Sequence, residues 1–261
     1  MWWDRSELAE VYLAPTCIGL ASRRADSASW IETDGLDDGI ARLAEALMQD
    51  PLQSCGRVRV WLGSALARPL LLSANSGARN RGEAKGLATM LAPDATGLDG
   101  PLRVWANAWR RNRGGLVVVM PESVWTALHG AIDQVRTERT RARHKDAART
   151  LELVSVRPWW NQAMDAVIGD SAKEGSCIGW SLTEGSGVVH GIVDKGTPVE
   201  AGFDLLGGHD VDGSLLRRRL QVNWNATTAS RHLEFARHGD GIGVGGSAPL
   251  GCWRASGGGA S

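Results

Sequence analysis

Residues 176–194 read Ser-Cys-Ile-Gly-Trp-Ser-Leu-Thr-Glu-Gly-Ser-Gly-Val-Val-His-Gly-Ile-Val-Asp. Ser176–Leu182 and Val188–Asp194 are rich in apolar and β-branched residues, and the turn residues Glu184-Gly185-Ser186-Gly187 separate them. Short connections that contain glycine between two such segments are typical of β-hairpins. The stretch therefore predicts a hairpin.

The Cys-Ile-Gly string of this hairpin also occurs earlier, at Cys17-Ile18-Gly19. There it lies in the extended segment Glu10–Ser22, which Pro15 interrupts and which we interpret as a first hairpin. Two similar hairpins, each followed by further strands and helices, indicate a duplicated α/β lobe.

The segments between the two hairpins alternate between strand and helix patterns. Apolar residues recur at helical spacing in Leu36–Met48, with Asp34 as its N-cap. The apolar run Leu116–Met120 predicts a strand buried on both faces, and Pro121 is expected to begin a long helix. Further strands are expected at Trp30–Glu32, Arg57–Leu62, Pro69–Leu72, Leu102–Trp105 and Leu151–Val156, and shorter helices at Glu83–Leu91, which Pro93 ends, and at Asn161–Ile168. After the second hairpin, a late strand is expected at Leu215–Asn223.

Composition excludes several classes of protein. Lys plus Arg and Asp plus Glu are each 29, so the net charge gives no sign of a nucleic-acid or membrane partner. No apolar run approaches the roughly 20 residues that cross a bilayer, and the first residues lack the features of a secretory signal. The four cysteines show no paired metal spacing. We therefore expect a soluble, intracellular protein with reduced cysteines.

Motifs with catalytic meaning are lacking. Residues 241–246 match GxGxxG by letter, but Pro249 and more glycine follow where a dinucleotide site needs a helix, so we interpret residues 241–261 as a disordered Gly-rich tail. The histidines show no metal-binding spacing. The carboxylates are scattered, so a two-metal nuclease is disfavoured. We expect no catalytic residue and no bound metal.

The segment 136–149 is strongly basic. Its cations could contact phosphates or acidic lipid. The alternative, which we favour, is a solvated helix end, where cations also suit the negative end of the helix dipole.

The order of these elements resembles the actin-like ATPase superfamily. Leu116–Glu122 is similar to that family's strand that ends in proline and begins a helix, and Val156-Arg157-Pro158 is similar to the later strand before the second phosphate hairpin. Within the family, the chain looks most like PilM of type IV pili and the cytoplasmic region of the type II secretion L protein, GspL. The resemblance implies a two-lobed α/β fold of ribonuclease H-like mixed sheets flanked by helices, with lobes at 1–110 and 111–240.

The same resemblance implies that Cys17, Gly19, Cys177 and Gly179 mark two degenerate phosphate hairpins. In the family, each hairpin carries Asp-Ile-Gly, and the aspartate orients Mg²⁺. Here cysteine replaces it, and a thiol is a poor partner for Mg²⁺. We therefore expect no cofactor, with ATP binding left as the open alternative.

A chain that keeps the shape of the family without its metal site is expected to act as a scaffold. The resemblance implies a cytoplasmic adaptor held at the inner membrane through a protein partner of a pilus or secretion assembly. The alternatives are an active ATPase or phosphotransferase of the same superfamily, and a small α/β enzyme or nucleic-acid-binding protein of another family.

Two adjacent tryptophans, Trp159 and Trp160, follow the strand Leu151–Val156. Adjacent residues of a strand point to opposite faces, so at most one ring is expected in the core and the other in a groove that binds the partner. The alternative is that both rings pack under the following helix.

Overall fold

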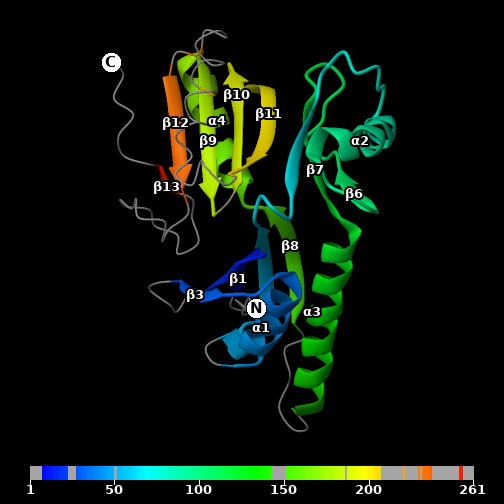
Figure 1. The fold of residues 1–261 in the computed structure, drawn as a ribbon, viewed down its shortest axis with the longest axis vertical. Coiled ribbons are helices and arrows are strands. Elements are labelled where there is room, and N and C mark those ends of the chain that lie inside the picture. Colours follow the sequence, from blue (N-terminus) through cyan, green and yellow to red (C-terminus); the bar gives the residue numbers. More distant parts are fainter. Residues whose placement is uncertain are drawn as a thin grey trace, which may run out of the picture. The chain divides into compact units, whose positions relative to one another are not determined.

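The computed structural model describes residues 8–22, 28–49, 52–142, 151–185, 187–206 and 231–236, the single residues 220 and 229, and the pair 253–254 (Figure 1). These residues divide into two compact units. The first contains the described residues up to Leu66 and those from Glu122 to Trp159, and the second contains Ala67–Pro121 and the described residues from Trp160 onward.

The first unit is built on one five-stranded mixed sheet, the first sheet. Its order is β3 (Ser29–Glu32), β2 (Cys17–Ser22), β1 (Leu8–Ala14), β4 (Arg57–Leu62) and β8 (Glu152–Pro158). The first three strands form an antiparallel meander, whereas β4 runs parallel to both β1 and β8. The parallel pairing brings residues from distant parts of the chain into one sheet.

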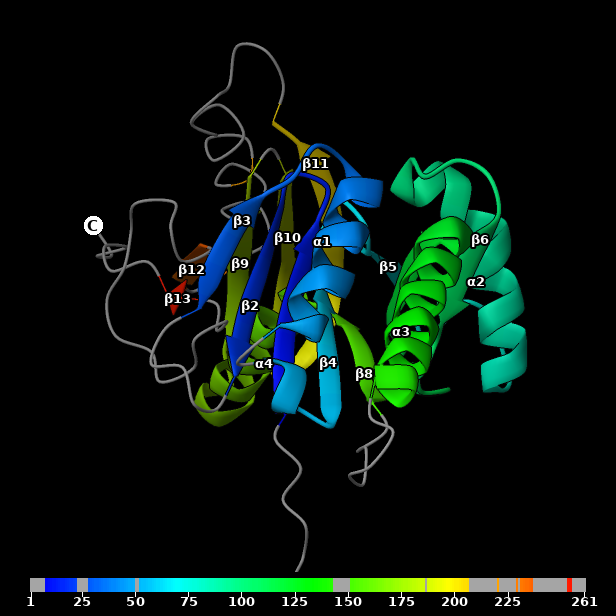
Figure 2. The same cartoon turned by 90° about the horizontal axis from the view of Figure 1, so that it is seen from below.

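Two helices belong to this unit, α1 (Leu36–Met48) and α3 (Glu122–Ala142), together with the short 3-10 helix η1 (Leu52–Ser54). The helix α1 packs against α3, β1 and β2, as Figure 2 shows. At Gly39 the approach is close, because an added Cβ would lie 3.2 Å from Leu13 Cδ1 and 3.6 Å from Ile18 Cγ2.

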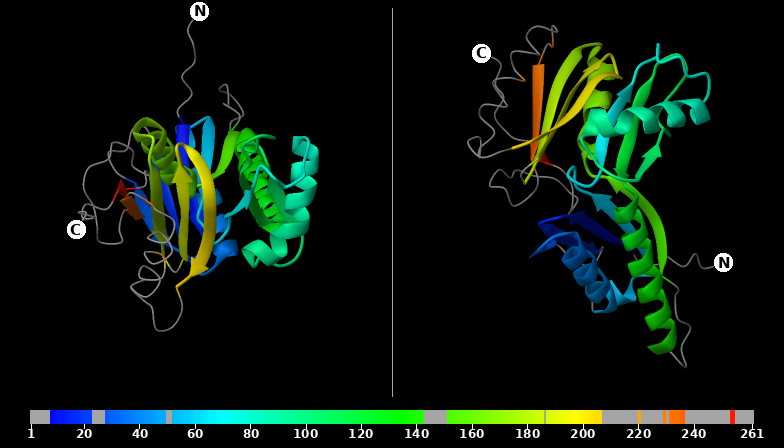
Figure 3. Two further views of the ribbon diagram at one scale, coloured as in Figure 1. Left: turned by 90° about the horizontal axis from the view of Figure 1, so that it is seen from above. Right: turned by 45° about the vertical axis from the view of Figure 1, so that its right-hand side comes forward.

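The second unit contains a sheet of similar strand order, the second sheet. Its order is β11 (Thr197–Leu205), β10 (Gly187–Asp194), β9 (Cys177–Glu184), β12 (Arg231–Ala236) and β13 (Trp253–Arg254). Again a three-stranded antiparallel meander is followed by a parallel strand, β12, seen beside β9 in Figure 3. The fifth strand differs, because β13 is antiparallel to β12. The helix α4 (Trp160–Glu174) packs on β9, β10 and β11.

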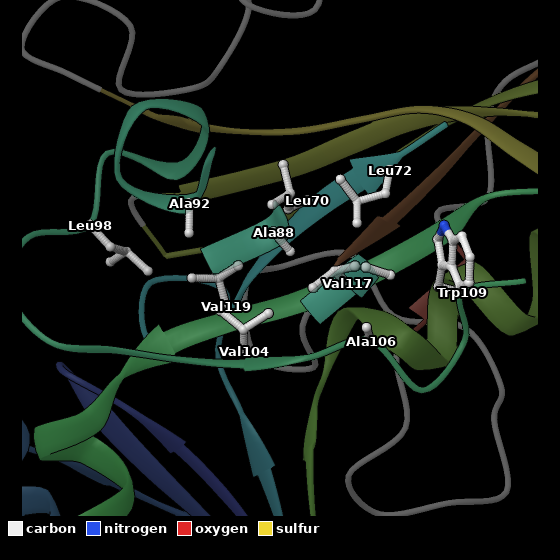
Figure 4. Packing of buried hydrophobic residues seen from close by; sticks show 11 residues of the cluster. Leu70, Leu72, Ala88, Ala92, Leu98, Val104, Ala106, Trp109, Val117 and Val119 are labelled. Atoms are coloured by element: carbon white, nitrogen blue, oxygen red, sulfur yellow. The ribbon is translucent and has the colours of Figure 1, made fainter. Parts of the chain in front are cut away.

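A third, antiparallel sheet lies in the second unit, in the order β5 (Arg68–Leu72), β7 (Gly115–Pro121) and β6 (Leu102–Trp105). The helix α2 (Arg81–Thr96) packs on it through alanines, which allow a close approach. Figure 4 shows the resulting core, in which Ala88 and Ala92 of α2 meet Leu70, Val117 and Val119 of the sheet.

These observations confirm the α/β class, the mixed sheets flanked by helices, and the hairpin at 177–194. The predicted helix Leu36–Met48 has the expected bounds, although Gly35 rather than Asp34 is its N-cap. The chain differs from expectation at Pro93, which lies inside α2. A proline in the last turn removes one N–H, and the Pro93 carbonyl still accepts the Gly97 N–H at 2.8 Å, so the helix continues to Thr96.

Each unit takes residues from both sides of position 110, where chain order suggested a division between lobes. The chain leaves the first unit at Leu66 and returns to it with α3 and β8, since β8 pairs with β4. The predicted strand Leu215–Asn223 lies outside the described residues except for Leu220. Of the tail 241–261, only Trp253–Arg254 is described.

Candidate functional site

The turn of the first hairpin, between β1 and β2, is Pro15-Thr16. Proline contributes no N–H donor to a turn. The carbonyl of Pro15 accepts the Thr33 hydroxyl at 3.1 Å, and the carbonyl of Thr16 accepts the Thr33 N–H at 3.0 Å. Oxyanions are bound by converging N–H groups, so this turn is poorly suited to hold a phosphate.

The hairpin's own carboxylate is already bonded, and the nearest one on the next strand is Glu32 of β3, which pairs with Cys17. Among Leu8–Ser22 the one acidic residue is Glu10, and its carboxylate accepts a 2.8 Å hydrogen bond from the Arg59 guanidinium. Within Leu8–Ser22, therefore, no acidic side chain stands ready to hold Mg²⁺.

Cys17 is the first residue of β2 and is buried. Gly19, two residues on, lies between Tyr12 of β1 and Trp30 of β3 in the register of the sheet. The Tyr12 and Trp30 rings meet edge to face with centroids 5.4 Å apart. A side chain at position 19 would stand between them, so Gly19 has a packing role that accounts for the glycine.

The two Cys-Ile-Gly strings are not equivalent in the fold. Cys17 directly follows its hairpin turn and pairs with Ala14, whereas Cys177 begins the first strand of its hairpin and pairs with Asp194 at the open end. Gly179 lies between Ile192 and His232 in the register of the second sheet, well before the turn. The two sheets do share a strand order, but the Cys-Ile-Gly strings do not lie at equivalent positions in it.

The Cys177 thiol is half-buried, and its pKa is raised, first by burial and second by the negative charge of Asp194. Both influences disfavour the thiolate, which is the form that binds metals and attacks electrophiles. The environment of Cys177 therefore does not favour reactivity.

The turn of the second hairpin has a different chemistry from the first. The last residue of β9 is Glu184, whose side chain is buried, and Gly185 follows with a φ of 55°. Glycine adopts this left-handed conformation without strain. A carboxylate next to glycine at a hairpin turn is the one described feature of the two hairpins that suits a metal-bound phosphate.

Both candidate anchor tryptophans are buried, which corrects the expectation that one of them faces a groove. The strand β8 ends at Pro158 and α4 begins at Trp160, so the alternation of a strand does not extend to these residues. In the first unit, the Trp159 ring meets Tyr12 edge to face at 5.4 Å. In the second unit, Trp160 Nε1 donates to the Ala67 carbonyl at 2.8 Å.

The first arginines of the basic segment 136–149 form hydrogen bonds within the first unit. Arg139 is buried and donates to the carbonyls of Cys55 at 2.7 Å, Leu52 at 3.0 Å and Leu47. Arg136 bonds the Leu151 carbonyl and the Asp133 carboxylate. These two cations stabilise the fold, and residues 143–149 lie outside the described part of the chain.

The second sheet carries a polar cluster that the sequence alone did not indicate. Ser181 Oγ lies 3.3 Å from His232 Nε2, across the pairing of β9 with β12. On the neighbouring strand β10, His190 Nε2 lies 3.0 Å from Asp204 Oδ2 of β11. The sequence does show polar and apolar residues alternating in these strands, which indicates that one face is polar. It does not show which strands pair, so it could not predict that these side chains meet. Within the described residues, no group of His, Cys, Asp and Glu is arranged to hold a metal ion.

No described helix is both long enough and apolar enough to span a bilayer.

Comparison with known proteins rests on structure, since no family model and no curated protein matches the sequence. A Bacteroides thetaiotaomicron protein with an actin-like ATPase fold and unknown function matches with a TM-score of 0.56 and 11% identity, over 87% of this chain and 80% of that chain. The PilM–PilN type IV pilus biogenesis complex matches with a TM-score of 0.50 and 12% identity, over 85% of this chain and 69% of that chain.

The cytoplasmic domain of EpsL, an inner-membrane component of the Vibrio cholerae type II secretion system, matches at 14% identity and a TM-score of 0.43, over 81% of this chain and 74% of that chain. At such identities the first two matches establish the fold and nothing further. The chain has the actin-like ATPase fold.

Proposed function

We propose that this chain is a non-catalytic adaptor in the assembly of a type IV pilus or a type II secretion-like machine. It acts on the cytoplasmic side of the inner membrane, where it binds a membrane-anchored partner or an assembly ATPase. The observation that carries the proposal is the first hairpin turn. Pro15 has no N–H group, and Thr33 donates hydrogen bonds to both carbonyls of the turn. The Glu10 carboxylate accepts a hydrogen bond from Arg59.

In the actin-like superfamily, two hairpins grip the nucleotide phosphates, and the resemblance assigns the first of these roles to β1–β2. Because proline removes one N–H donor from this turn and the hairpin's own carboxylate is bonded to Arg59, the hairpin is poorly suited to bind phosphate or to hold Mg²⁺. The fold shared with PilM in a pilus biogenesis complex supports the choice of machine. A protein that keeps the fold but has a weakened phosphate hairpin fits an adaptor better than an ATPase.

The second candidate is an active ATPase of the same fold, and the second hairpin favours it. Glu184 is a buried carboxylate that stands next to Gly185 at the turn, an arrangement that would suit a metal-bound phosphate. The ATPase candidate requires the Glu184 carboxylate for phosphate release, whereas the adaptor does not.

Phosphate release from ATP separates the candidates. The full chain is assayed with Mg²⁺ and with a chelator, beside Glu184→Gln at the turn and Asp194→Asn at the open end of the same hairpin. The adaptor predicts no release above buffer for any of the three proteins. Turnover that the chelator stops, and that Glu184→Gln abolishes while Asp194→Asn keeps it, would establish the ATPase.

Affinity purification of the tagged chain from its own cells tests the adaptor role directly. Inner-membrane assembly proteins are expected to be enriched at least about tenfold over an untagged control. Equal recovery of these proteins from both preparations would contradict the proposal.

A further inference from the structure

Two loops leave the third sheet at the same end. Leu72, the last residue of β5, pairs with Gly115, the first residue of β7. β6 runs antiparallel to β7, so its last residue, Trp105, lies toward that end. The loops 73–80 and 106–114 therefore start or finish there. The helix α2 begins at this end as well, because its last residue, Thr96, is bonded to Arg68 at the opposite end of β5.

This end of the sheet is strongly basic. Five exposed arginines lie in the two loops and at the start of α2, and we call them the arginine patch: Arg79, Arg81, Arg110, Arg111 and Arg113. The one carboxylate in the same segments is Glu83, which accepts hydrogen bonds from the Arg79 N–H at 2.8 Å and from Asn80 Nδ2 at 2.8 Å. Since the whole chain has no net charge, the positive potential here is local.

The backbone beneath the patch is fixed. Trp109 is 2% exposed and packs in the core of the third sheet, where Figure 4 shows its ring. Arg110 and Gly114 exchange two 2.8 Å backbone hydrogen bonds. Gly114 has a φ of 66°, and an added Cβ would lie 2.3 Å from the Leu72 carbonyl oxygen. The loop can therefore present its arginines without a large ordering cost on binding.

The guanidinium donors are available for a ligand. Among the described residues, Arg79, Arg81, Arg111 and Arg113 form no side-chain hydrogen bond or ion pair. Arg110 uses one nitrogen for the carbonyls of Asn107 and Trp109. A guanidinium has five donors in a planar fork that matches a carboxylate or a phosphate.

We propose that the arginine patch binds an acidic segment of a partner protein, a run of Asp and Glu side chains. Proteins that lie on a membrane insert apolar side chains, and proteins that bind single-stranded nucleic acids stack the bases on exposed aromatic rings, so these two ligands suit the patch less well. The exposed positions of loops 73–80 and 107–113 offer arginine, alanine, serine, asparagine and glycine, and the single aromatic ring, Trp109, is buried. This binding does not depend on the adaptor role proposed above.

A binding titration tests the assignment. The probe is a rhodamine-labelled peptide of eight alternating Asp and Glu residues, with the matching Asn and Gln peptide as the uncharged control. The full chain is compared with Arg110→Gln/Arg111→Gln/Arg113→Gln and with Arg57→Gln/Arg141→Gln/Arg157→Gln, which removes as many exposed arginines from the first unit.

The patch variant is expected to bind the acidic peptide about tenfold more weakly, and the control variant within about twofold of the parent. Raising the salt concentration from 50 to 300 mM should also weaken binding severalfold. Equal loss in the two variants would show that only overall charge matters and would overturn the assignment. Tighter binding to phosphatidylglycerol vesicles or to an oligonucleotide than to the peptide would overturn it as well.

Discussion

The indole Nε1 of Trp160 donates a 2.8 Å hydrogen bond to the carbonyl oxygen of Ala67, which lies 93 residues earlier. Both residues are buried in the second unit. Trp159, the preceding residue, belongs to the first unit, where its ring packs on Tyr12. Where the chain passes from the first unit to the second, the two adjacent tryptophans are therefore packed in different units.

Trp160→Phe should lower the free energy of unfolding by about 1–3 kcal/mol, because it leaves the buried Ala67 carbonyl without its donor. Trp61→Phe is the control, at a half-buried ring of the first unit. Trp61 Nε1 has no hydrogen-bond partner within the described residues, so this change should cost less than about 1 kcal/mol. Urea denaturation followed by circular dichroism measures both. Equal losses would show that ring volume, and not the hydrogen bond, sets the cost.

Arg139→Met should destabilise the first unit by about 3 kcal/mol. The guanidinium serves three buried carbonyls near the end of α1 and after it, and methionine can bond none of them. Arg141→Met changes an exposed residue of the same helix and should stay within about 0.5 kcal/mol of the parent. The same urea titration applies, and a stable Arg139→Met variant would show that water can replace the guanidinium.

Two glycine-to-alanine substitutions should change the free energy of unfolding in opposite directions. An added Cβ at Gly191 would lie 2.3 Å from the Glu200 carbonyl oxygen and 3.0 Å from Trp180 Nε1, so Gly191→Ala should cost about 1–3 kcal/mol. At Gly86, inside α2, nothing lies within 4 Å of the new Cβ, so Gly86→Ala should stabilise by about 0.5–1 kcal/mol. Melting temperatures that move the same way in both variants would contradict this.

Cys177 should react with iodoacetamide at pH 8 more slowly than the same cysteine in the urea-unfolded chain. Its pKa is raised from the usual 9.0 by burial and by Asp194, which lowers the thiolate fraction. Asp194→Asn should speed the reaction only in part, because burial is the larger cause. Mass spectrometry of the alkylated peptides gives the rates. Faster alkylation of Cys177 in the folded chain would be incompatible with a raised pKa.

The same shift affects stability at alkaline pH. A folded chain whose thiol pKa is raised keeps a proton that the unfolded chain loses. The contribution of Cys177 is therefore complete below the unfolded pKa and is lost as pH rises through the folded pKa. Cys177→Ser should reduce the decline in stability above pH 9, the usual pKa of the thiol.

The sequence alone determined the local elements and much of the architecture. Helical spacing in Leu36–Met48 and the paired apolar segments around Gly185 each fix local structure, because backbone periodicity and turn geometry depend on neighbouring residues. The order of these elements also led to the actin-like fold. The departure of both hairpins from Asp-Ile-Gly was likewise visible in the sequence.

Only the tertiary structure decided where the chemistry lies. It showed that Cys17 and Cys177 occupy different ends of their hairpins, and that Trp159 and Trp160 are both buried. It also brought the arginines of two separate loops to one end of the third sheet. Strand register and loop proximity arise from pairing between residues far apart in the chain, and no local pattern of residues encodes that pairing.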